Sequence, residues 1–302
     1  MSRRSSVGTC YGFAVKSDLP FRFLRQGGGN ELDVFVSPAA DDGSDGDLLR
    51  EWSSEDPPGH QIRIYGERER YRLWSTVLGW FTIDPAAPSI GVPDSDLDIA
   101  REQMTLVTAT LLCFHARGDL PLHAAAIDVG GEAIILAAPG TLGKTTLSAA
   151  FWRSGHRVLS EDLTCLRLAP EPAAIPGPAM IRLRRDVAEE IDLPDVDVVV
   201  ETPTRVCFAF DGARRGDCSP VPIRAVVLLL TSDDDIRLER VDAATAVRDL
   251  WTLCGLFPTD EDFARRFEAV TDLADAVPVY SLSRALRFDN LDRVVERIVA
   301  NV

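Results

Sequence analysis

Lysine is almost absent from this chain: of its 32 basic residues only Lys16 and Lys144 are lysines, and arginine supplies the rest. Positive charge is also the minority sign, because 47 acidic residues bring the net charge to −15 over 302 residues. A nucleic-acid backbone needs a basic face, so this balance argues against broad nucleic-acid binding. An acidic surface suits solubility or, alternatively, a basic peptide partner.

Long apolar runs are missing as well. No stretch reaches the roughly 20 residues that a membrane-spanning helix needs, and the N-terminal MSRRSSVGTCYGF lacks the apolar centre of a signal peptide. We therefore expect a cytoplasmic protein without a membrane partner. The six cysteines show no C-x-x-C spacing and no nearby histidine cluster, so separate reduced thiols are expected rather than a zinc site or a disulfide framework.

Length and composition allow a substantial core. A hydrophobic share of 46% is ordinary for a globular protein, and 302 residues suit one large domain or two smaller ones. We predict two, with a β-rich N-terminal domain at residues 1–93 and a second domain at residues 94–302. The first shows strand-like runs at 11–15, 33–36, 60–65 and 70–74, separated by Gly- and Asp-rich breaks at 26–30 and 41–47.

Four aromatic residues of the first domain leave two interpretations open. Trp52, Trp74, Trp80 and Phe81 lie in or beside the predicted strands. Aromatic residues in strands usually belong to a core, and the alternative is a peptide-docking surface.

The second domain combines helical and strand periodicity. Residues 97–115 are apolar nearly all round, which predicts a helix buried between the two domains. Further helices are expected at 145–154, 245–256, 260–273 and 290–299, and strands at 132–137, 205–210, 223–230 and 277–282. The acidic run 233–235 is expected to be a solvated hairpin turn.

The segment from 132 to 154 is a predicted strand, a Gly-containing loop and a helix. At a helix start the first backbone N–H groups lack internal partners and the helix dipole adds positive character, so such a turn can hold phosphate. The loop Ala138-Pro-Gly-Thr-Leu-Gly-Lys-Thr-Thr146 is close to the phosphate-binding pattern G-x-x-x-x-G-K-[ST], with Ala138 in place of the first Gly. The predicted nucleotide-binding residues are Pro139, Gly140, Thr141, Leu142, Gly143, Lys144, Thr145 and Thr146.

Two of these residues have specific expected duties. Lys144 would place charge on the β- and γ-phosphates, and Thr145 would offer a hydroxyl to Mg²⁺. The alternative is a chance G-K-T at a helix start with a solvated lysine.

An acidic pair follows on the next predicted strand. Glu161 and Asp162 come after the apolar Val158-Leu159, seventeen positions beyond Lys144. A carboxylate at the end of a neighbouring strand is where a phosphate-loop protein places its Mg²⁺-side acid. Because neighbouring side chains on a strand point to opposite faces, both acids can act only if the strand ends there and the backbone turns. Taken alone, the pair would suit a solvated turn equally.

These residues together resemble a known family. His123, fifteen positions before Ala138, the loop and the acidic pair are similar to the catalytic domain of HPr kinase/phosphorylase, and more closely to the HPr-kinase-related proteins of lasso-peptide type gene clusters. That family carries a His, then G-x-S-G-x-G-K-[ST], then an acidic pair that is usually Asp-Asp. The resemblance implies an α/β P-loop domain of the HPr kinase/PEP-carboxykinase type with a mixed sheet at 94–302, and possible homo-oligomers.

The resemblance also assigns roles. Glu161 would be the catalytic base, His123 a neighbour that assists it, Lys144 a catalytic cation, and Asp162 with Thr145 the Mg²⁺ partners. Arg182, in a Pro-Gly-Pro then Arg-Leu order similar to the family, either faces a phosphate or forms a salt-bridged strand edge.

The expected function is ATP- and Mg²⁺-dependent phosphorylation of a hydroxyl, that of a Ser in a peptide or protein. Two alternatives stay open. One is a nucleotide-binding regulatory module with impaired chemistry, motivated by Ala138 and by Glu161 in place of Asp. The other is a P-loop enzyme that transfers phosphate to or from a small metabolite.

Overall fold

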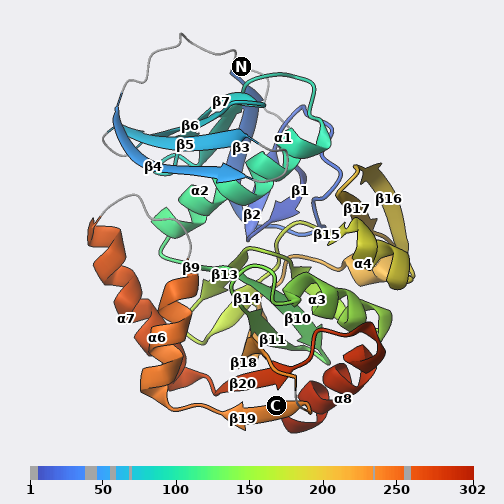
Figure 1. The fold of residues 1–302 in the computed structure, drawn as a ribbon. Coiled ribbons are helices and arrows are strands. Elements are labelled where there is room, and N and C mark those ends of the chain that lie inside the picture. The colour runs from blue at the N-terminus through green and yellow to red at the C-terminus, as the bar shows by residue number, and fades with distance from the viewer. Residues whose placement is uncertain (1–5, 38–45, 55–58, 68–69, 234, 255–259) are drawn as a thin grey trace.

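A computed structural model describes residues 6–37, 46–54, 59–67, 70–233, 235–254 and 260–302. Figure 1 shows an upper part built on one sheet and a lower part of mixed sheets with helices on both sides. The chain is therefore a mixed α/β protein, as the sequence predicts. The expected break at 41–47 falls mostly outside the described residues, and the boundary at residue 93 stays a prediction.

Within the described residues, the upper part is an eight-stranded sheet in the order β1-β2-β3-β8-β7-β6-β5-β4. Its strands are β1 (Ser6–Cys10), β2 (Phe13–Lys16), β3 (Asn30–Val36), β4 (Asp47–Ser54), β5 (His60–Glu67), β6 (Arg70–Ser75), β7 (Gly79–Asp84) and β8 (Ser89–Val92). The predicted runs 33–36, 60–65 and 70–74 lie in strands, and the run 11–15 does so from Phe13 on, because Tyr11 and Gly12 form the turn between β1 and β2. Strand β3 pairs in parallel with both β2 and β8.

The aromatic residues of this sheet divide between its faces. Phe81 is fully buried and Trp52 packs against the same core, which confirms the core interpretation for these two. Trp74 and Trp80 are half-buried, and the guanidinium groups of Arg63 and Arg72 lie 5.0 and 4.5 Å from their ring centres.

A helical segment lies beneath the sheet, where Figure 1 shows it between the two parts. It consists of α1 (Ile99–Gln103), a π-helical stretch η1 (Met104–Ala109) and α2 (Thr110–Ala116). The Asp98 side chain accepts from the backbone N–H of Arg101 and caps its start. The predicted buried helix at 97–115 is confirmed, although its apolar pattern does not indicate the π-helical stretch. Its apolar side chains share one core with the sheet above, and that core continues to Cys165 and Ile175 below.

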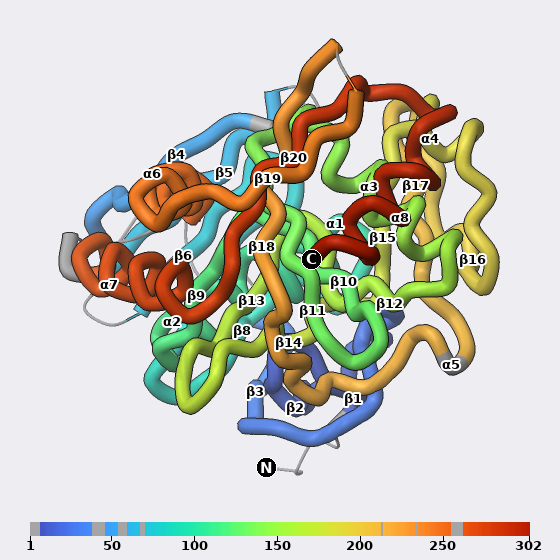
Figure 2. The backbone as a smooth tube through the Cα atoms, turned by 90° about the horizontal axis from the view of Figure 1, so that it is seen from below, coloured from blue at the N-terminus to red at the C-terminus, as the bar shows by residue number. Residues whose placement is uncertain are grey.

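The lower part is organised on a second sheet, nine-stranded among the described residues. Its strands are β9 (Leu120–Leu122), β10 (Ala124–Val129), β11 (Glu132–Ala137), β12 (Arg157–Ser160), β13 (Thr164–Arg167), β14 (Ala173–Ile175), β18 (Val221–Thr231), β19 (Arg237–Arg240) and β20 (Val279–Arg284). Strands β11, β18 and β20 are parallel neighbours, whereas β10 is antiparallel to both β11 and β12. Figure 2 shows these strands side by side from below. The sheet is mixed, as expected.

Helices cover both faces of this sheet. On one side α3 (Lys144–Arg153) and α8 (Leu291–Asn301) share a core with β10 and β11, and on the other α6 (Ala243–Leu253) and α7 (Asp260–Ala276) form a second core. A smaller sheet of the described chain joins β15 (Met180–Arg184), β17 (Arg205–Phe210) and β16 (Val196–Glu201). The short elements are α4 (Arg185–Glu190), α5 (Gly212–Arg215) and η2 (Phe288–Asn290). No helix within the described ranges is long and apolar enough to cross a membrane.

One expectation about this sheet is wrong. The run 233–235, of which residue 234 lies outside the described part, does not join a hairpin. Strand β19 pairs antiparallel with β20, and β20 lies between it and β18. The parallel pairing of β20 with β18 places Val279 and Leu282 in the core, and this burial outweighs the short local connection.

Candidate functional site

Two breaks in neighbouring strands bring His123 to the acidic pair. His123 separates β9 from β10, and residues 161–163 separate β12 from β13. The breaks lie at the same level, because Ala126 pairs with Ser160 on one side of them and Leu122 pairs with Thr164 on the other. The backbone N–H of His123 also donates to the carbonyl of Leu253 at 2.8 Å, which fixes the break to the end of α6.

The acids occupy a tight turn. The backbone N–H of Leu163 donates to the carbonyl of Glu161 at 2.9 Å, and Asp162 between them has φ 69°. A hydrogen bond across one residue in this left-handed conformation is the arrangement of a γ-turn, which is rare and strained. The turn removes the strand alternation that would send the two side chains to opposite faces. With the alternation removed, both acids can act at one site.

The loop before α3 has its own left-handed positions. Gly143 caps the helix at φ 73°, and Thr141 has φ 71° although it is not glycine. Ala138, which replaces the first Gly of the motif, has no positive φ, and its side chain is buried in the core. A Cβ is therefore accommodated at 138. The first helical hydrogen bond runs from Leu147 N–H to the Gly143 carbonyl, at 2.9 Å.

This loop and helix start offer backbone donors to an anion. The N–H groups of residues 144–146 precede the first helical hydrogen bond, so the helix itself supplies them with no acceptor. Pro139, Gly140 and Thr141 are exposed, while Leu142, Gly143, Thr145 and Thr146 are half-buried. The loop residues predicted to bind nucleotide are thus solvent-accessible, except for Lys144, which is buried.

Five predicted site residues are in direct contact across the loop and the turn. The hydroxyl of Thr145 donates to Glu161 Oε1 at 2.5 Å, and His123 Nε2 lies 2.9 Å from Asp162 Oδ1. Lys144 Nζ lies 3.5 Å from the same Asp162 oxygen, and its side chain is only 6% exposed. A buried lysine that faces a carboxylate is not the solvated lysine of the chance alternative.

The acids have exchanged the partners expected from the sequence. We expected His123 beside Glu161 and Thr145 with Asp162, but His123 contacts Asp162 and Thr145 contacts Glu161. The γ-turn is the physical reason, because the left-handed conformation at Asp162 turns this side chain toward the His123 break.

The pKa values of the site's charged groups move in different directions. Burial, and then repulsion from Asp162, raise the pKa of Glu161. Desolvation by the surrounding protein acts in the same direction on Asp162, but the hydrogen bond with His123 and the charge of Lys144 outweigh it, so the pKa of Asp162 lies well below its usual range. Burial lowers the pKa of Lys144, against the attraction of both acids. Asp162 is the acid that stays ionised, and Glu161 keeps its proton to higher pH.

Arg284 also belongs to the site, and none of the sequence motifs includes it. It ends β20, is 2% exposed, and its Nη2 donates to the carbonyls of Leu142 and Gly143 at 3.2 and 3.4 Å. Its Nη1 is buried without a hydrogen-bond partner among the described residues. Burial lowers its pKa to about 10, so it is still a cation at neutral pH. Its only signal in the sequence is a basic residue at the end of a predicted strand.

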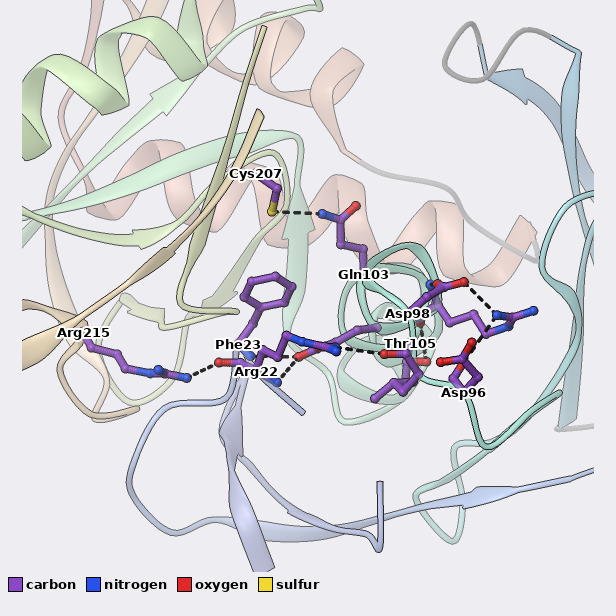
Figure 3. Close-up of polar contacts among 11 residues, drawn as sticks. Arg22, Phe23, Asp96, Asp98, Gln103, Thr105, Cys207 and Arg215 are labelled. Atoms are coloured by element: carbon purple, nitrogen blue, oxygen red, sulfur yellow. Dashed lines mark hydrogen bonds and ion pairs between the residues drawn. The ribbon is translucent and has the colours of Figure 1, made fainter. Parts of the chain in front are cut away.

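Arg182 lies on the side of the site that faces the upper sheet. Its Nη1 donates to Gln103 Oε1 at 3.3 Å, and its positive charge lowers the pKa values of Glu161 and Asp162. Gln103 in turn donates to Cys207 at 3.6 Å, a contact drawn in Figure 3. The Gln103 side chain thus orients Arg182.

The donor atoms present suit a hard cation. Thr145, Glu161 and Asp162 supply a hydroxyl and carboxylate oxygens, the ligand types that Mg²⁺ takes. Within the described ranges, no group of three or more His, Cys, Asp and Glu side chains is placed to hold a metal. Mg²⁺ commonly binds through one or two carboxylates together with substrate phosphates. The acidic pair beside the loop therefore suits Mg²⁺ that arrives with a phosphate ligand.

No protein-family model and no curated protein matches the chain. Among solved structures, it is similar to the Hpr(Ser) kinase/phosphatase from Coxiella burnetii, at 11% sequence identity and a TM-score of 0.32 over 60% of this chain and 94% of the other. A TM-score of 0.32 is too low to support a conclusion about fold or activity. The function is therefore argued from the contacts of this chain.

Proposed function

We propose that the chain is an ATP- and Mg²⁺-dependent kinase that phosphorylates a hydroxyl, that of a Ser in a peptide or protein. One observation carries the proposal: a buried lysine at a helix start lies within 3.5 Å of an ionised carboxylate that also contacts a histidine. Phosphoryl transfer depends mainly on positioning and charge neutralisation, and needs a cationic phosphate site beside a proton acceptor.

Three sources of positive character surround the loop. They are the free N–H groups of the α3 start, Lys144, and Arg284 beneath the carbonyls of Leu142 and Gly143. Burial lowers the pKa of Arg284, and among the described residues no carboxylate offsets its charge. An anionic phosphate at the loop would supply the missing counter-charge.

The contacts divide the acids between the two sides of the reaction. Asp162 is 60% exposed and contacts His123, so it is the acid that an acceptor hydroxyl can reach, and we assign it as the base with His123 as its orienting partner. Glu161 and Thr145 would hold the metal, because a divalent cation would stabilise the ionised form of Glu161 that burial, and then repulsion from Asp162, disfavour. When bound, Mg²⁺ would neutralise charge on the phosphates.

One of the two reasons for the alternative, a nucleotide-binding regulatory module with impaired chemistry, is weakened by the backbone at Ala138. Ala138 has an ordinary backbone conformation and is buried in the core, so the missing Gly does not disturb the loop. The other motive, Glu161 in place of Asp, is compatible with a metal-side role, in which a longer side chain reaches Thr145.

The test compares the two lysines. Lys144→Ala should weaken Mg-ATP binding and abolish transfer of labelled phosphate, because it removes the buried charge at the phosphate site. Lys16→Ala is the control, since Lys16 lies in β2 and pairs with Glu31 on the upper sheet. Unchanged nucleotide affinity and transfer in Lys144→Ala would refute the phosphate site.

The acceptor is identified in the same assay. Labelled ATP and Mg²⁺ are added with the protein to lysate of the native host, with Lys144→Ala in parallel. Label on a protein or peptide supports the proposed acceptor class, and label on a small molecule supports the metabolite alternative. Binding of nucleotide without any transfer favours the regulatory module.

A further inference from the structure

A cavity of about 590 Å³ opens beside the phosphate loop, at the carboxyl ends of β18 and β20. Its lining is Thr231, Ser232, Asp233, Ala285, Leu286 and Arg287. In Figure 2 the chain leaving β18 and the chain leaving β20 reach the same end of the molecule. Ligands of open α/β sheets bind outside the carboxyl ends of parallel strands, so the cavity is on the expected edge. None of the sequence motifs pointed to it.

The cavity adjoins the loop directly. A Cβ built on Gly143 would lie 3.3 Å from Leu286 Cδ2 and 2.9 Å from Arg284 Nη2. Leu286 is therefore in van der Waals range of the helix start that we assign to phosphate. A molecule held by its phosphates at the loop can extend into the cavity without crossing a gap.

The order of the strands decides which part of a nucleotide lies there. Strands β12 and β10 lie on one side of β11, and β18 lies on the other. The acids come directly after β12 and His123 comes directly before β10, so all three lie on this first side of β11. The phosphoryl group that is transferred must therefore point toward β12 and β10. The opposite end of a nucleoside triphosphate, its base and ribose, then points toward β18 and β20.

We infer that this cavity binds the nucleoside of the phosphate donor, with Leu286 against the base. The inference rests on the proposed kinase function and adds the site that would select a nucleotide over inorganic polyphosphate. Leu286 is 52% exposed and provides an apolar contact for a ring face in the cavity. The hydroxyl of Thr231 and the carboxylate of Asp233 offer partners for ribose hydroxyls. The Arg287 guanidinium is held by Asp289 at 3.1 Å.

The experiment measures the affinities of ATP and of inorganic triphosphate, each with Mg²⁺, for the full chain and its variants. In the parent, ATP should bind more tightly than triphosphate. Leu286→Asn, which is uncharged and of similar size, should weaken ATP binding roughly tenfold or more, because the base loses an apolar contact, and should leave triphosphate binding unchanged. Leu286→Met, which keeps an apolar side chain at this position, should bind ATP as tightly as the parent. Leu48→Asn is the matched control, because Leu48 is also 52% exposed but lies in β4 of the upper sheet.

Each outcome separates this inference from the proposed function. Equal affinity of the parent for ATP and triphosphate, or an equal loss of both in Leu286→Asn, would overturn the nucleoside site while leaving the phosphate site in place. Failure of the parent to bind either compound would refute the phosphate site, and the nucleoside site with it.

Discussion

Glu161 and Asp162 are neighbours in sequence, but their different partners give them different expected responses to replacement. Asp162→Asn removes a negative charge and a proton acceptor from the His123 contact. Asn tolerates the left-handed conformation that the turn imposes at this position, so the fold should survive. If Asp162 is the base, the single-turnover rate should fall by roughly 10²–10⁴-fold with little change in nucleotide affinity.

Glu161→Gln should have the complementary effect. It keeps the size of the side chain but removes the charge next to Thr145, so Mg²⁺-supported nucleotide binding should weaken while metal-free binding changes little. Titrations with and without Mg²⁺, beside single-turnover rates for both variants, measure the two effects. If Glu161→Gln lowers the rate and Asp162→Asn lowers metal-supported binding, the role division expected from the family resemblance is right and the one argued from the contacts is wrong.

At the scale of elements, the junction of β11, the loop and α3 depends on a conformation that few residues adopt. Gly143→Ala forces an L-residue into φ 73° and places a Cβ 2.9 Å from Arg284 Nη2. The left-handed conformation alone costs about 1–2 kcal/mol. We expect a loss of at least that much free energy of unfolding, measured by denaturant titration, together with weaker Mg-ATP binding.

Gly140→Ala is the control for stability in that titration. A Cβ at Gly140 meets nothing within 4 Å, and its φ is not positive. Its free energy of unfolding should match or exceed that of the parent. Equal losses of unfolding free energy in the two variants would show that neither the left-handed conformation of Gly143 nor its closeness to Arg284 determines the stability of the loop.

The elements that local sequence specifies were the predictable ones. Helical spacing after the G-K-T and an apolar run before it place β11 and α3 to within a residue or two, and a short apolar group places the end of β12. What the sequence did not reveal depends on distant pairing. Arg284 reaches the loop from about 140 positions away in the chain, and β19 finds β20 instead of β18. The partner exchange of the acids depends on one left-handed residue, which periodicity cannot detect.

At the scale of the whole molecule, the upper sheet is tied to the helical segment beneath it by a buried carboxylate. Glu102 is fully buried in α1, and one of its oxygens accepts from the backbone N–H groups of Arg22 and Phe23 at 2.6 and 2.8 Å, in the region drawn in Figure 3. Burial raises its pKa, although these hydrogen bonds and the charge of Arg22 oppose the shift.

The raised pKa of Glu102 predicts a pH dependence of stability. The folded chain keeps this proton at a pH where the unfolded chain has lost it, so the contribution of Glu102 is fully present in acid and declines as pH rises through the folded-state pKa. The stability difference between the parent and Glu102→Gln should therefore favour the parent most at acid pH and shrink toward neutrality. Denaturant titrations of both proteins at a series of pH values measure it. A difference that is constant, or that grows with pH, contradicts the assignment.

The upper part also reaches the acidic turn itself. Arg25 is buried, and its guanidinium donates to the carbonyls of Val158 and Leu159 in β12, at 2.9 and 3.1 Å. The hydroxyl of Tyr11 donates to the carbonyl of Leu163, the residue directly after the acids, at 2.9 Å. Burial raises the pKa of Tyr11, which keeps this hydroxyl a donor. Residues of the N-terminal sheet thus hold both ends of the segment that carries Glu161 and Asp162.

Tyr11→Phe tests whether this contact positions the acids. The change removes one hydroxyl, leaves the ring against Phe114, and should cost about 1–3 kcal/mol because a buried carbonyl loses its partner. If the hydrogen bond holds the turn in place, the transfer rate should also fall roughly ten- to a hundredfold at unchanged Mg-ATP affinity, since small displacements of a catalytic group are costly. Ser17→Ala is the control, because it removes a buried hydrogen bond of the same kind, from Ser17 to the Val34 carbonyl at 2.8 Å, together with the bond that Ser17 accepts from the Leu19 N–H, in the upper part of the molecule. Both variants should lose stability, and only Tyr11→Phe should lose rate. A parent-like rate in Tyr11→Phe, or equal rate losses in both variants, would show that the N-terminal sheet supports the fold without positioning the acidic pair.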